Sequence, residues 1–163
     1  MIRAGQVPTL THGNMTRFGM ALPLATQFIS RVLSEMRGGD IFVPILPAFS
    51  LATLAKAAWR MWGLGGTEDP RWPVAGTRPG NERLYEILLS WEEADHRAHY
   101  APPTPEALDG YYVVDPTARS WDREPWTPTP DLKEYRSSLP HRWLTTPELL
   151  ASFTCLDLGL PSA

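Results

Sequence analysis

The sequence has 163 residues, enough for one domain that buries most of the surface its unfolded chain exposes. A net charge of −3 excludes a generally basic surface for nucleic acid, and no segment approaches the ~20 apolar residues of a membrane-spanning helix. The single cysteine, Cys155, cannot form an intramolecular disulfide, and the first residues lack the apolar run of a signal peptide. We therefore expect a cytoplasmic protein with no nucleic-acid or membrane partner.

The first half of the chain predicts alternating helices and short strands. Apolar residues recur at three- and four-residue steps over residues 21–36, which indicates an amphipathic helix. Residues 40–44 are typical of a short buried strand, and Ser50 is placed to cap a second helix that ends near residue 61. Residues 73–76 predict another strand, and Pro79 suits the first turn of a third helix that reaches about Trp91.

The second half predicts one clear strand at 111–114 and a short helix after Thr145 and Glu148, which have capping-box spacing. Between them, residues 116–130 hold four prolines and two tryptophans and indicate an extended arm. We expect a mixed α/β fold in two parts: a lobe of residues 1–115, and a Pro/Trp-rich arm with a terminal helix at 116–163. The strands are too few for an independent doubly wound sheet.

Several catalytic signatures are absent from the sequence. No glycine-rich turn of the G-x-G-x-x-G kind follows a strand, no tyrosine precedes a lysine by four positions, and there is no G-x-S-x-G elbow. His96 and His99 have helical spacing, but no further ligand pattern completes a zinc site. We therefore predict neither catalytic residues nor a metal site.

Two arginine motifs remain as candidates for binding. The first is M-T-R-F at residues 15–18, and the second is R-P-G-N-E-R-L-Y-E at residues 78–86. An arginine next to a helix N-terminus supplies the donors that a diphosphate needs, and Glu82 can accept from ribose hydroxyls. The residues alone leave open a structural salt bridge for Arg78 and a helix-dipole role for Glu82.

In combination, these motifs resemble the C-terminal portion of CapD/CapE-like polysaccharide-biosynthesis proteins. That family comprises extended short-chain dehydrogenase/reductases, among them UDP-N-acetylglucosamine 4,6-dehydratases and related epimerases. The resemblance extends over the whole chain and is carried in order by M-T-R-F (15–18), G-G-D-I-F-V-P (38–44), G-T-R-P-G (76–80) with Y-Y-V-V (111–114), and Y-R-S-S with W-L-T-T-P-E-L (135–149). It implies the substrate-binding lobe of such an enzyme.

The resemblance also implies roles for individual residues. Arg17 and Arg78 correspond to the arginines that contact the diphosphate of a UDP-sugar, and Glu82 to a carboxylate associated with the uridine ribose. Thr9 and Thr11 lie in the stretch that runs along the base. The family's NAD(P)-binding Rossmann domain and its catalytic residues have no counterpart in this sequence, so we expect the cofactor on a missing half.

Three departures separate the chain from the family pattern. Asn81 is an extra residue between R-P-G and the glutamate, and Tyr85 replaces a histidine. The family's S-S-D-T-N becomes S-S-L-P-H at residues 137–141, which predicts a loosened loop.

Three hypotheses follow. The chain is one subunit of a split enzyme that assembles with a separately encoded Rossmann subunit, or it is a non-catalytic remnant or stand-alone binding module for UDP-sugars. The third is a small α/β interaction domain whose motif matches are accidental. The sequence favours the first slightly, and leaves open dehydration versus epimerisation and the identity of the sugar.

Overall fold

The structure is a computed structural model that describes residues 2–36, 39–62, 71–80, 82–103, 110–114, 127–129 and 131–154. Its helices in these ranges are η1 (Ile2–Ala4), α1 (Leu22–Glu35), α2 (Leu51–Met61), α3 (Trp91–Arg97) and α4 (Thr146–Thr154). Its strands are β1 (Thr16–Phe18), β2 (Ile41–Pro44), β3 (Ala48–Ser50), β4 (Ile87–Leu89), β5 (Ala98–Ala101), β6 (Tyr111–Val114), β7 (Thr127–Pro128) and β8 (Tyr135–Arg136). The expected mixed α/β class is confirmed.

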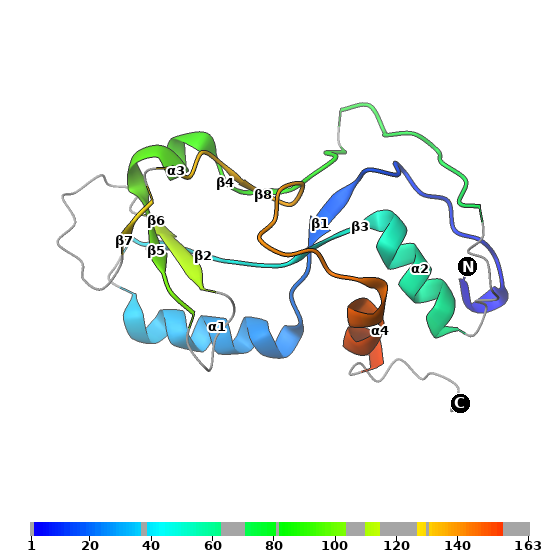
Figure 1. Cartoon of the computed structure of the whole chain (residues 1–163), viewed down its shortest axis with the longest axis horizontal. Helices are drawn as coiled ribbons and strands as arrows, with labels where there is room; N and C mark the ends of the chain where they lie inside the picture. Colours follow the sequence, from blue (N-terminus) through cyan, green and yellow to red (C-terminus); the bar gives the residue numbers. More distant parts are fainter. Residues whose placement is uncertain are drawn as a thin grey trace.

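The largest sheet has the order β2-β6-β5-β7, with every neighbouring pair antiparallel. The inner strand β6 is buried along its full length, as expected for consecutive apolar residues covered on both faces. Helix α1 runs along one side of this sheet (Figure 1), and its Phe28 ring meets Tyr111 edge-on at 5.9 Å between ring centroids. A hydrophobic core cluster that includes Val43, Leu89 and Tyr135 joins this sheet to β4 and β8.

A polar contact completes the packing of α1 on the sheet. The hydroxyl of Tyr111 donates to the carboxylate of Glu35, which also accepts from Arg31 at 2.8 Å. Burial and the Glu35 contact raise the pKa of the Tyr111 hydroxyl, so it stays a neutral donor. The inner face of α1 is thereby fixed by an aromatic and a charge-assisted contact.

Helices α2 and α4 lie in a second group, near the strand pair β1–β3 (Figure 1). Ser50 caps α2 as expected, accepting from the Thr53 N–H at 3.0 Å. Helix α4 packs beside α2, and its predicted capping contact is present: the Thr145 N–H donates to Glu148 at 2.8 Å. This hydrogen bond, with help from Arg142, lowers the pKa of the Glu148 carboxyl.

The expected helix from Pro79 to Trp91 is wrong. Gly80 has a φ of +87°, residues 87–89 form strand β4 against β8, and the helix begins only at Trp91. Ser90 and Glu93 form a reciprocal capping box, which fixes the start of α3 at Trp91. Pro79 does not begin a helix. The expected strand at 73–76 is reduced to one parallel bridge between Leu10 and Val74.

The proposed division at residue 115 stays a prediction. Residues 116–126 of the arm lie outside the described residues, as does Cys155. Beyond them, β7 pairs with β5, β8 pairs with β4, and α4 contacts α2. Within the described ranges, no helix is both long and apolar enough to cross a membrane.

Replacing Tyr135 by phenylalanine tests the core. Its hydroxyl accepts from the Leu46 N–H at 2.7 Å and donates to the Leu46 carbonyl at 3.0 Å, and the residue is 2% exposed. Tyr135→Phe leaves both backbone groups unpaired, so the free energy of unfolding should fall by about 1–3 kcal/mol in denaturant titration. Tyr100→Phe is the matched control, since its hydroxyl has no hydrogen-bond partner within the described chain; equal losses in both variants would contradict this account.

Candidate functional site

Strand β1 brings the two arginine motifs side by side. On one edge β1 pairs with β3, with Arg17 opposite Phe49. On its other edge the Thr16 N–H donates to the Leu84 carbonyl at 2.8 Å, and the Phe18 N–H donates to the Glu86 carboxylate at 2.8 Å. The segment of residues 82–86 therefore lies along M-T-R-F, although the contacting residues are 66 to 68 positions apart in the sequence.

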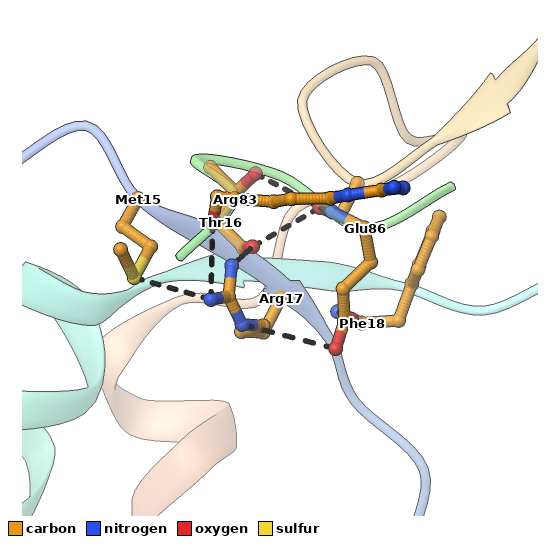
Figure 2. A network of polar contacts seen from close by, with 7 residues as sticks. Met15, Thr16, Arg17, Phe18, Arg83 and Glu86 are labelled. Carbon is orange, nitrogen blue, oxygen red and sulfur yellow. Dashed lines mark hydrogen bonds and ion pairs between the residues drawn. The ribbon is translucent and has the colours of Figure 1, made fainter. Parts of the chain in front are cut away.

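The guanidinium of Arg17 is held by backbone carbonyls from both motifs (Figure 2). Nη1 donates to the Thr16 carbonyl at 2.7 Å, and Nη2 donates to the Arg83 carbonyl at 3.1 Å and contacts the Met15 sulfur at 3.2 Å. The Nε atom lies 3.8 Å from a carboxylate oxygen of Glu86. Carbonyl acceptors fix the plane of the guanidinium fork without neutralising its charge.

Arg17 keeps capacity for an anion. A guanidinium has five N–H groups, and hydrogen bonds within the described residues use three of them. The two remaining N–H groups are one on Nη1 and that of Nε, and the side chain as a whole is 27% exposed. The carboxylate of Glu86 is the competing anion; its position beyond hydrogen-bond distance of Nε makes that competition weak.

Arg78 and Glu82 are joined through the backbone. The Glu82 carboxylate accepts from the Arg78 N–H at 2.9 Å, which closes a turn containing Pro79 and Gly80. The Arg78 side chain is exposed, and no ion pair holds it within the described residues. The exposed side chain of Arg78 therefore disfavours a structural salt bridge. The hydrogen bond from the Arg78 N–H occupies one carboxylate oxygen of Glu82, and the other oxygen can accept from a further donor.

Thr9 and Thr11 flank the bridge between Leu10 and Val74. Leu10 donates to the Pro73 carbonyl at 2.8 Å, and Ala75 donates back to the Leu10 carbonyl at 2.9 Å. The threonine segment is thereby attached to the strand-like stretch that leads to Arg78. Thr9 is exposed and Thr11 is half-buried.

The predicted site residues thus fall into two groups. Arg17 is in direct contact with residues 83–86, whereas Thr9, Thr11 and the Arg78 turn are connected through residues 73–75. The premise that a helix N-terminus follows Arg78 is wrong, because residues 82–86 are not helical. A helix dipole therefore makes no contribution to anion binding at Arg78.

The sequence alone indicates no separate role for Thr16, Arg83, Glu86 or Ser137, although these residues build the surroundings of Arg17. All four belong to motifs that were singled out, so a signal was present. Their roles depend on contacts over long sequence separations, such as 121 residues between Thr16 and Ser137. The loop at 137–141, expected to be loosened, is held at both ends: Ser137 is fully buried, and Nε2 of His141 lies 2.9 Å from the Tyr112 hydroxyl, whereas Leu139 between them is 67% exposed.

The described residues do not fit a dinucleotide or a metal. Their named strand pairs are all antiparallel, so the parallel β-α-β unit whose glycine-rich turn holds a pyrophosphate is not among them. In the same part of the chain, no three His, Cys, Asp or Glu residues gather as metal ligands. No chemical step can be derived through a nicotinamide on these residues.

Comparison with known proteins identifies the class. The chain belongs to the polysaccharide biosynthesis protein family, whose model matches residues 1–103. It is therefore a CapD-like portion of an extended short-chain dehydrogenase/reductase.

Named relatives agree with this class. The chain is 27% identical over 115 residues to the inverting UDP-N-acetylglucosamine 4,6-dehydratase of Campylobacter jejuni, covering 71% of this chain and 29% of that protein. It is 37% identical over 92 residues to UDP-glucose 4-epimerase of Rickettsia canadensis, covering 56% and 26%. With the capsular polysaccharide biosynthesis protein CapD of Staphylococcus aureus it is 36% identical over 115 residues, covering 70% and 19%. The chain thus spans less than a third of each of these relatives.

The solved structure of Pen from Bacillus thuringiensis has the same fold over most of this chain. The TM-score is 0.63 at 22% identity, and the match covers 91% of this chain and 40% of Pen. This likeness supports the architecture described above.

Proposed function

We propose that this chain is the UDP-sugar-binding part of a polysaccharide-biosynthesis 4,6-dehydratase or epimerase and does not complete the reaction alone. The observation that carries the proposal is the contact between the two arginine motifs, in which Arg17 donates to the Arg83 carbonyl at 3.1 Å. That contact holds a partly exposed, charged guanidinium next to the segment that begins with Arg78. Relatives named for UDP-sugar substrates support the ligand class.

In this proposal the two arginines bind the diphosphate. Guanidinium donors match phosphate oxygens in geometry and charge, and such charge-assisted bonds are roughly twice as strong as neutral ones. The free oxygen of Glu82 accepts from the ribose, and Thr9 and Thr11 line the base. The ligand of choice for a first test is UDP-N-acetylglucosamine, on the strength of the 27% identity to the dehydratase.

The nicotinamide cofactor and the groups that transfer protons belong, in this proposal, to a Rossmann half that the sequence does not span. A surface that suits this partner is the outer face of α1, where four large apolar side chains lie at helical spacing: Leu22, Ile29, Leu33 and Met36. Leu22 is 74% exposed and Leu33 is 66% exposed, whereas Phe28 on the inner face packs on Tyr111. We propose that the Rossmann half covers this stripe, whether it lies on the same polypeptide or on another.

Thermal unfolding with UDP-N-acetylglucosamine tests the binding function. A ligand at 100 times its dissociation constant adds about 2.7 kcal/mol, which raises the midpoint by about 5–10 °C for a domain of this size. Arg78→Ala should weaken binding at least about tenfold, since it removes a charge-assisted contact. Arg60→Ala, which removes an exposed arginine from α2, is the matched control and should keep the full shift. A cooperative transition that the ligand leaves unmoved would contradict the proposal.

A variant on α1 tests the partner. Coexpressed with a Rossmann half encoded beside it, the chain should form a 1:1 complex in sedimentation velocity. Leu33→Asp places a charge on the apolar stripe and should abolish the complex, because an unpaired carboxylate is costly to bury. Gln27→Asp adds the same charge on another side of α1 and should not. A complex that survives Leu33→Asp would place the contact elsewhere, and the lack of any such coding segment would argue for a stand-alone binding module.

A further inference from the structure

One buried residue far along the chain reaches the surroundings of both arginine motifs. Ser137 follows β8, lies outside the residues 1–103 that match the family model, and is 0% exposed. Its hydroxyl contacts Thr16 of β1 and the backbone of Glu86, and these two residues belong to different motifs. A buried polar residue in this place is a candidate for more than packing.

The hydrogen bonds of Ser137 can be assigned by counting. Its hydroxyl donates to the Thr16 carbonyl at 3.1 Å and accepts from the Glu86 N–H at 2.9 Å. Because a hydroxyl has one proton and two lone pairs, the 2.9 Å contact with Thr16 Oγ1 must have Thr16 as the donor. The Ser137 N–H also donates to the Glu86 carbonyl at 2.9 Å. Every donor and acceptor of the Ser137 hydroxyl is thus used.

The Thr16 carbonyl connects Ser137 to Arg17. It accepts from the Ser137 hydroxyl at 3.1 Å and from Arg17 Nη1 at 2.7 Å, which fills its two lone pairs. On the other side, Glu86 is fixed by Ser137 through its backbone and holds the Phe18 N–H through its carboxylate. Ser137 therefore sets the position of the carbonyl that orients the guanidinium and of the carboxylate beside it.

We propose that Ser137 is a positioning residue for the UDP-sugar site, acting on Arg17 through the carbonyl of Thr16. The proposal rests on the proposed binding function and assigns no contact between Ser137 and the ligand. If so, removing the hydroxyl should misorient Arg17, because the Thr16 carbonyl loses one of its two donors and Thr16 Oγ1 and the Glu86 N–H lose the acceptor that they share. A purely structural serine would lower stability and leave the orientation of Arg17 unchanged.

Binding of UDP-N-acetylglucosamine separates these two roles. Isothermal titration is carried out at a temperature where every variant is folded. Ser137→Ala should raise the dissociation constant by about tenfold, and Ser137→Thr, which keeps the hydroxyl, should restore much of the loss. Tyr135→Phe is the matched control: it removes a buried hydroxyl two residues away that bonds Leu46, so it lowers stability without reaching Arg17. An unchanged dissociation constant for Ser137→Ala, or an equal loss in Tyr135→Phe, would overturn the proposal.

A ligand-free measurement distinguishes failure of this proposal from failure of the binding function. Phenylglyoxal modifies accessible guanidinium groups, and mass spectrometry gives the rate at each arginine. Ser137→Ala should raise the rate at Arg17 several-fold relative to the exposed Arg60, whether or not the chain binds a UDP-sugar. An unchanged ratio would overturn the positioning role on its own. If Ser137→Ala does not fold, Ser137→Cys, which nearly keeps the volume and weakens the donor, serves in both measurements.

Discussion

The carbonyl of Thr16 is the acceptor on which the candidate site depends. It receives Arg17 at 2.7 Å and Ser137 at 3.1 Å, so one backbone oxygen joins the first motif to a residue from the end of the chain. The other edge of β1 is fixed by β3, and the segment of residues 82–86 is held to β1 by hydrogen bonds of Thr16 and Phe18. A strand of only three residues has little stability of its own. Its neighbours on both sides therefore determine where Arg17 points.

Local patterns in the sequence predicted the elements whose stability is local or whose residues are uniformly apolar. Helix α1, the Ser50 cap of α2, strand β6 and the capping contact at Thr145 appear within a residue or two of their expected bounds. The expected helix at 79–91 failed because its apolar residues Ile87 and Leu89 pair with β8, about fifty residues away. Periodicity over so short a run cannot distinguish a strand from a helix when the partner is remote.

The candidate site, too, was predicted where local motifs indicate it and missed where it depends on remote contacts. The motif resemblance indicated Arg17, Arg78 and Glu82, and the structure describes contacts at each of them. It could not indicate that the Glu82 carboxylate closes the Arg78 turn, nor that Ser137 meets Thr16 across 121 residues. Such contacts follow from chain topology and not from spacing. The chain has the fold of the matching part of Pen and corresponds to 40% of that protein.

The most direct test of the account is a titration of the chain with UDP-N-acetylglucosamine followed by NMR of backbone amides and arginine side chains. The account predicts that the side chains of Arg17 and Arg78 and the amides of Thr9 and Thr11 shift together, with one dissociation constant. Shifts confined to other surfaces, or Arg17 and Arg78 titrating with different constants, would contradict a single site built from the two motifs.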